Sequence, residues 1–277
     1  MKYTLCAFAA FTSLAANIAT ANPTTIIEVY ASRGENSHVG DFSDDRNGAG
    51  LEISHFMQLQ SGRELQFDLR YLDDNADLPI DAEYSAHQTL IALHYELQLG
   101  SIDAALFGGY LRTKAYYDQS KPDEFALFGV ETRHQPYENF QIDAQLGALR
   151  FLDGYYEHDE SKTLPFGSMR GTYFVSDSLQ LSLGLSLMRG SDFGDSTTDD
   201  LYLRIITLEA KKSLNQNLSL FARFTEYYGG YSSDPDEGGY ILALGAEYTF
   251  GAQRSRENSK RQILDFTPFT FPRYEDW

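Results

Sequence analysis

The stretch Tyr240-Ile-Leu-Ala-Leu-Gly-Ala-Glu-Tyr-Thr-Phe250 alternates apolar and small or polar residues. In a β-strand, successive side chains point to opposite faces. The odd positions include Gly245, Glu247 and Thr249, so that face is small or polar. The other face is continuously apolar and ends in two aromatic residues. It carries Tyr240, Leu242, Leu244, Ala246, Tyr248 and Phe250. In a soluble sheet this face would be core, whereas in a membrane barrel it would contact lipid.

The same alternation recurs along the chain in about twelve runs. The clearest run is 179–187, where leucine stands at every odd position and Gln, Ser or Gly stands between. Most runs have roughly the ten residues that a tilted strand needs to cross a bilayer. The run 201–212 is less regular, with Ile205 expected to point inward and Arg204 outward. The runs cover residues 24–32, 49–60, 64–71, 85–99, 102–112, 124–133, 140–149, 164–175, 179–187, 201–212, 218–228 and 240–250.

The connections between these runs alternate between long and short. Long ones are expected around 34–48, 73–84, 117–123, 153–163, 190–200 and 229–239, and short ones around 61–62, 100–101, 135–139, 176–178 and 215–217. Membrane barrels show this alternation because short turns face the periplasm and long loops face the outside. A soluble β-sandwich has no such rule.

Gly245, Tyr248 and Phe250 resemble the C-terminal assembly signal of Gram-negative outer-membrane barrels, in which two alternate aromatic residues follow a glycine. Together with the repeated runs, this resemblance predicts an all-β fold. The predicted fold is a transmembrane antiparallel up-and-down β-barrel of about twelve strands, similar to small porins. No apolar run approaches the roughly 18 residues of a membrane-spanning helix.

The two ends of the chain differ from the barrel region. Residues 1–21 have the pattern of a secretory signal peptide, with Lys2, an apolar segment and the small-residue site Ala19-Thr20-Ala21. The only cysteine, Cys6, lies in this segment, so we expect no disulfide in the exported chain. Residues 22–250 are predicted to form the barrel. Residues 251–277 are predicted to be a periplasmic tail, basic at first and then aromatic and proline-containing.

The inward-facing polar residues are the candidate pore lining. A formal net charge of −18 makes nucleic acid an unsuitable partner. Acidic residues outnumber basic ones on the inner face, so a pore should prefer cations. The same charges can instead pair and stiffen the wall, and the sequence leaves both interpretations open. The candidate lining is Glu64, Asp68, Arg70, His94, Glu96, Glu131, Arg133, Asp143, Arg170, Glu209, Arg223 and Glu247.

Two weaker patterns are compatible with catalysis. Pairing across the turn near Pro136 is expected to place Glu131 opposite Asp143, which gives either an acid–base pair or a cluster bridged by Arg133. His94 is expected to point inward beside Glu96, but no nucleophile completes this unit. The histidines lack zinc-ligand spacing, and the acidic loops lack an EF-hand pattern. We therefore assign no catalytic residue and no cofactor.

The predicted function is a monomeric, porin-like channel of the Gram-negative outer membrane. It would admit small hydrophilic solutes or cations by passive diffusion. Its expected partners are outer-membrane lipid, lipopolysaccharide and the barrel assembly machinery. Two alternatives stay open at this point: a barrel enzyme acting on lipid or peptide, and a non-conducting barrel whose loops bind a partner.

Overall fold

The structure is a computed structural model. It describes residues 23–37, 43–59, 61, 63–77, 83–99, 102–116, 122–153, 163–190, 201–231 and 237–251. The predicted signal peptide and nearly all of the predicted tail lie outside these residues. The described strands are β1 Thr24–Ser37, β2 Ser43–Gln58, β3 Glu64–Asp77, β4 Glu83–Leu99, β5 Ile102–Tyr116, β6 Asp123–Tyr137, β7 Phe140–Asp153, β8 Thr163–Phe174, β9 Leu179–Gly190, β10 Leu201–Ser213, β11 Leu218–Tyr231 and β12 Glu237–Gly251.

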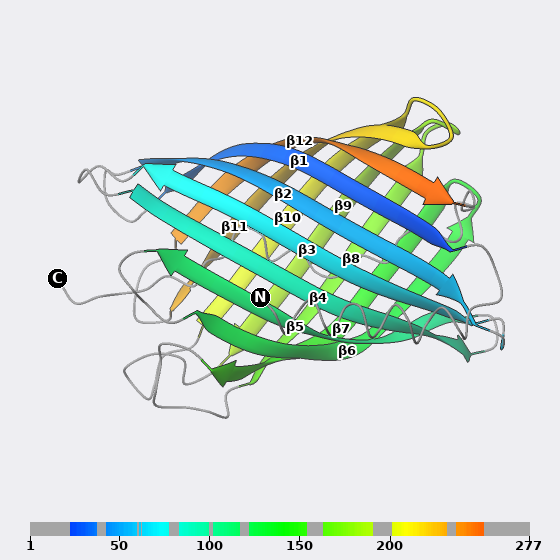
Figure 1. Ribbon diagram of the computed structural model, residues 1–277, viewed down its shortest axis with the longest axis horizontal. Coiled ribbons are helices and arrows are strands. Elements are labelled where there is room, and N and C mark those ends of the chain that lie inside the picture. Colours follow the sequence, from blue (N-terminus) through cyan, green and yellow to red (C-terminus); the bar gives the residue numbers. More distant parts are fainter. Residues whose placement is uncertain are drawn as a thin grey trace.

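These strands form one closed barrel in which each strand pairs with its sequence neighbours (Figure 1). β12 closes the barrel by pairing with β1, from Thr24 opposite Gly251 to Ser37 opposite Gly238. All pairings are antiparallel. The predicted twelve-stranded up-and-down barrel is confirmed.

The strands are longer than the alternating runs suggested. They contain 12 to 17 residues, and β1 and β2 are separated only by residues 38–42. The expected long loop at 34–48 is therefore mostly strand, and the loops at 73–84 and 229–239 are shortened in the same way. These additional strand ends were missed because a strand that extends beyond the membrane has no lipid-facing side. Its residues can be polar on both faces, so the sequence shows no alternation there.

Consecutive connections lie at opposite ends of the barrel, with the short turns at the right in Figure 1. Side chains hold two of these turns. The Ser176 hydroxyl accepts hydrogen bonds from the backbone N–H groups of Ser178 and Leu179. The Asn215 carboxamide oxygen accepts from those of Asn217 and Leu218, both at 2.9 Å. Such local bonds substitute for a backbone turn and favour short connections.

The outer face of the wall is apolar, as the alternation predicted. In β9, the leucines at 181, 183, 185 and 187 are 38–55% exposed. On β12, Leu244, Tyr248 and Phe250 face outward, whereas Glu247 faces inward with 7% exposure. Outward leucines and aromatics are the lipid-contacting surface that a transmembrane barrel requires.

Candidate functional site

The inner face of the wall has two zones along the barrel axis. In β6, Phe125 and Leu127 lie toward the long loops, and Glu131 and Arg133 lie toward the short turns. The inward residues of β4, β7, β8 and β10 divide in the same order. We call these the long-loop half and the short-turn half. From β4 to β11 the long-loop half is largely apolar and the short-turn half is polar and charged, whereas the long-loop half of β2 and β3 carries the buried Arg46 and Asp74.

Fifteen buried side chains of the long-loop half form one apolar cluster along β4 to β11. They are Leu90, Ala92, Phe107, Leu111, Phe125, Leu127, Leu149, Phe151, Leu164, Phe166, Met188, Leu201, Leu203, Ile205 and Tyr227. Each is at most 8% exposed. The sequence prediction identified only Ile205 of this set as inward. A sequence pattern that indicates the apolar cluster was nevertheless present in β6 and β7. There, apolar residues occupy consecutive positions and therefore both faces of the strand.

Polar side chains also enter the long-loop half, where Arg46 of β2 forms an ion pair with Asp74 of β3. The Arg46 guanidinium also donates a 3.0 Å hydrogen bond to the Tyr227 hydroxyl of β11. This arginine therefore ties together strands on both sides of the β1–β12 seam. The sequence prediction did not include it.

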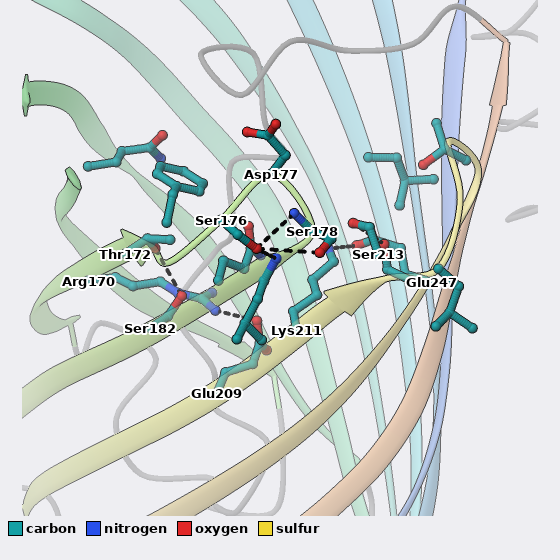
Figure 2. A pocket seen from close by; sticks show the side chains of 18 of the residues that line it. Arg170, Thr172, Ser176, Asp177, Ser178, Ser182, Glu209, Lys211, Ser213 and Glu247 are labelled. Carbon is teal, nitrogen blue, oxygen red and sulfur yellow. Dashed lines mark hydrogen bonds and ion pairs between the residues drawn. The ribbon is translucent and has the colours of Figure 1, made fainter. Parts of the chain in front are cut away.

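The short-turn half contains a cavity of about 910 Å³ (Figure 2). Its wall is formed by the short-turn ends of β7 to β12, by Ile26 of β1 and by two short turns. Hydroxyl and amide groups alternate there with charged groups. The polar lining includes Gln141, Asp143, Gln145, Ser168, Arg170, Thr172, Gln180, Ser182, Glu209, Lys211, Ser219 and Glu247. Such a surface can hydrogen-bond water or a polar solute.

Charged groups beside this cavity form a chain of ion pairs. Glu209 of β10 accepts hydrogen bonds from Arg170 of β8 and Arg223 of β11, each at 2.8 Å. Arg223 also reaches Glu28 of β1 at 2.9 Å. Lys211 forms an ion pair with Glu247 on the same side. Glu28 was not among the predicted lining residues, because the alternation of its strand was visible only on the apolar outer face.

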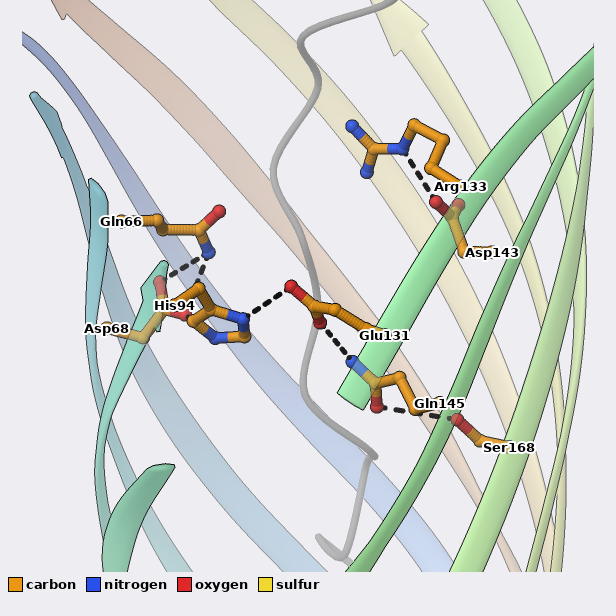
Figure 3. Close-up of polar contacts among 8 residues, drawn as sticks. All are labelled: Gln66, Asp68, His94, Glu131, Arg133, Asp143, Gln145 and Ser168. Atoms are coloured by element: carbon orange, nitrogen blue, oxygen red, sulfur yellow. Dashed lines mark hydrogen bonds and ion pairs between the residues drawn. The ribbon is translucent and has the colours of Figure 1, made fainter. Parts of the chain in front are cut away.

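On the opposite side, His94 of β4 lies between two carboxylates (Figure 3). Its Nδ1 is 2.8 Å from Oε1 of Glu131, and its Nε2 is 2.9 Å from Oδ2 of Asp68. The second contact is close but lacks the direction of a hydrogen bond. Gln66 donates to Asp68, and Gln145 donates to Glu131 at 2.9 Å. The His94 side chain is only 1% exposed, so it is enclosed by this polar cluster.

Two expected pairings are wrong in detail. Glu131 lies opposite Gln145, and Arg133, not Glu131, lies opposite Asp143 with a 2.7 Å ion pair. β6 continues through Pro136 to Tyr137, so the turn lies at 138–139 rather than around Pro136, and this moves the register of Glu131 by two residues. The carboxylates beside His94 come from other strands, while Glu96 accepts a hydrogen bond from the backbone N–H of Glu64.

All twelve candidate lining residues lie on the face of their strands that turns toward the lumen. The structure joins most of those that are charged into pairs along the wall: Arg70 with Glu52, Arg133 with Asp143, Arg170 and Arg223 with Glu209, and His94 with Asp68 and Glu131. This arrangement fits the structural alternative, in which the charges stiffen the wall. Within the described residues, no group of three His, Cys, Asp or Glu side chains could hold a metal ion. No helix in the described part of the chain is long and apolar enough to cross a membrane.

No protein-family model matches the chain, and neither does any curated protein. Solved structures do match. The chain is similar to a COG4313 outer membrane channel from Pseudomonas putida F1, with 15% identity and a TM-score of 0.65, over 84% of this chain and 97% of that one. The fold is that of an outer-membrane β-barrel channel. Two further likenesses have TM-scores of 0.48. One is to the translocator domain of the autotransporter NalP from Neisseria meningitidis, with 11% identity over 90% of this chain and 96% of that one. The other is to the NanC porin, with 10% identity over 78% and 98%.

Proposed function

We propose that this barrel is a passive outer-membrane channel for small solutes. The observation that carries the proposal is the division of its inner wall. A polar cavity of about 910 Å³ occupies the short-turn half, and an apolar lining occupies the long-loop half. Along β4 to β11 the two zones are in series on the barrel axis, so a solute that crosses the membrane along this side of the lumen passes both.

The apolar zone should favour solutes that lose water easily. Narrow hydrophobic stretches of a channel oppose water and ions by dewetting. Transfer of a polar group without a hydrogen-bonding partner is also unfavourable. The hydrophilic solutes and cations expected from the sequence are suited to the short-turn half, but each hydroxyl or charge adds to their barrier in the long-loop half. We therefore infer a preference for small, weakly hydrated molecules and a low ion current.

The enzyme alternative has less support from the geometry. His94 is enclosed, and its ring nitrogens face carboxylates rather than a nucleophile. The inward Ser168 hydroxyl donates a hydrogen bond to Gln145 rather than to His94. We propose no catalytic residue, and we propose that a signal peptide exports the chain to the outer membrane. There its partners would be lipid, lipopolysaccharide, the assembly machinery and the transported solutes.

Uptake into proteoliposomes tests the channel and its preference together. The solutes are a hexose and its 6-deoxy derivative, which are close in size and differ by one hydroxyl group. We expect both to enter faster than into protein-free liposomes, and the deoxy sugar to enter faster than the hexose. Equal uptake with and without correctly folded protein would contradict the channel. Faster entry of the hexose, together with a large cation current, would instead support the hydrophilic pore.

A further inference from the structure

Inward aromatic side chains lie directly opposite inward glycines at several places in the wall. A glycine has no Cβ, so a ring from the neighbouring strand can lie flat over it. Two groups of such pairs are continuous across four adjacent strands. A ring that lies flat against the wall occupies less of the lumen than one that points toward the axis.

The first row crosses β5 to β8 and contains Phe107, Gly129, Gly147 and Phe166, each opposite the next. A Cβ on Gly129 would lie 2.5 Å from Cζ of Phe107, and one on Gly147 would lie 2.7 Å from Cζ of Phe166. The two ring centroids are 6.1 Å apart. Both phenylalanines are 4% exposed. The rings therefore cover the two glycines and meet between them.

The second row crosses β2, β1, β12 and β11 and contains Gly50, Tyr30, Gly245 and Phe221. The three atoms nearest to a Cβ on Gly50 would all belong to the Tyr30 side chain. A Cβ on Gly245 would overlap the Phe221 ring. The Tyr30 and Phe221 centroids are 6.3 Å apart. Arg223 lies over both rings, at 5.0 Å from Phe221 and 5.8 Å from Tyr30.

The two rows face each other across the lumen. The first is centred between β6 and β7 and the second between β12 and β1, so they are half a turn apart in the strand order. The heights of the two rows can be compared from Thr24, because Tyr30 lies on the same strand and Phe107 is reached from Thr24 by stepping across paired residues. The successive partners are Phe56, Gln66, His94 and Phe107. With spacings of about 3.3 Å along a strand and 4.8 Å between strands, at a tilt of about 40°, both rows lie roughly 10–20 Å above Thr24.

We propose that these opposed rows form the waist of the channel, and that the glycines set its width by holding the rings against the wall. The proposal rests on the channel function argued above and names the residues that set the upper size limit of the solutes that pass. It places the waist where the polar and apolar zones meet. His94 borders one side, with its ring centroid 5.9 Å from that of Phe107, and Arg223 borders the other.

The test uses Gly50→Ala, because the new methyl group displaces the end of a side chain rather than backbone. Gly184→Ala is the matched control. Gly184 is also inward in β9, but its Cβ would meet Thr207 Cβ at an ordinary 3.7 Å. Folding of each variant is checked by heat-modifiable gel mobility. The readout is swelling of proteoliposomes in uncharged sugars of increasing size.

We expect Gly50→Ala to slow entry of the larger sugars several-fold relative to the smallest, and Gly184→Ala to behave as wild type. Adding Tyr30→Ala to Gly50→Ala should restore entry. Tyr30→Ala or Phe107→Ala alone should admit larger sugars than wild type. An unchanged size profile in Gly50→Ala would overturn the waist, as would unchanged profiles in both ring variants if Gly50→Ala does not fold. A folded wild type that admits no solute would overturn the channel function and the waist with it.

Discussion

Among single residues, His94 of β4 joins three strands in the polar half of the wall. It contacts carboxylates from β3 and β6, and the whole group is buried. Removing one partner from a buried ionic group leaves an uncompensated charge, which typically costs about 3–5 kcal/mol. The His94 side chain therefore stabilises the wall between β3 and β6, because its ring lies between two carboxylates and contacts both.

We predict that His94→Ala lowers the free energy of unfolding by about 3–5 kcal/mol, because Asp68 and Glu131 then lose the imidazole between them and the amides of Gln66 and Gln145 do not replace its charge. Urea titration of the refolded barrel in lipid measures this change. Glu96→Gln is the matched control, since Glu96 contacts the backbone of Glu64 rather than His94. A larger loss in Glu96→Gln than in His94→Ala would show that the structure assigns the wrong carboxylates to His94.

The inside–outside assignment of β9 gives a second prediction. Leu183 is 55% exposed on the lipid side, and Ser182 is 6% exposed on the side of the polar cavity. Leu183→Arg should reduce stability by about 2–4 kcal/mol if it lies near the bilayer midplane. Ser182→Arg should cost less, because its side chain enters the cavity. Equal losses in the same urea titration would count against this alternation.

For the strands and turns, the structure separates two sets of connections at opposite ends of the barrel. We predict that single cysteines at Asp153, beside the β7–β8 loop, react with an impermeant thiol reagent on whole cells. Single cysteines at Asp177, in the β8–β9 turn, should react only after the outer membrane is opened. Both positions are exposed, so access rather than burial decides the result. Faster labelling of Asp177 on intact cells would reverse the orientation.

The lipid-facing side of the strands was predictable from the sequence, and two other properties were not. Lipid imposes a continuous apolar face, which produces the alternation in stretches such as Leu179–Leu187. The inner face has no such constraint, and apart from Ile205 it was expected to be small or polar. Leu127 and Leu149 show that it is apolar near the long loops. The register of Glu131 was missed because Pro136 suggested a turn, whereas β6 continues through this proline to Tyr137.

The candidate site was likewise predictable only in part. Alternation was sufficient to place Glu131 and Arg170 on the inner face. Which strands would bring partners to them depends on barrel closure and on the stagger between distant strands. The pairs between Arg223 and Glu28, or between Arg46 and Tyr227, join residues far apart in sequence. The inward glycines that are covered by aromatic rings were missed for the same reason. Gly50 makes room for a ring only because strand pairing places it opposite Tyr30.

For the whole molecule, closure requires no residue after Gly251, because β12 already pairs with β1 along its length. We predict that a chain ending at Gly251 still folds and shows heat-modifiable mobility like the full chain. Comparison of solute uptake by the two chains then reports on the proposed tail. Unchanged uptake is expected for a tail that leaves the lumen open. Faster uptake would mean that the tail obstructs it, and failure to fold would contradict closure by β12 alone.

The central claim is that the lumen is a channel whose apolar half limits the flow of ions. Planar-bilayer recording of wild type beside Leu149→Ser/Leu203→Ser tests this most directly, because both residues are buried in the apolar lining. Hydroxyl groups there should let water and ions enter. Leu183→Ser, on the lipid face, is the control. We predict a small wild-type current, a several-fold larger current in the double variant and no change in the control. A large wild-type current that the double substitution leaves unchanged would contradict the account.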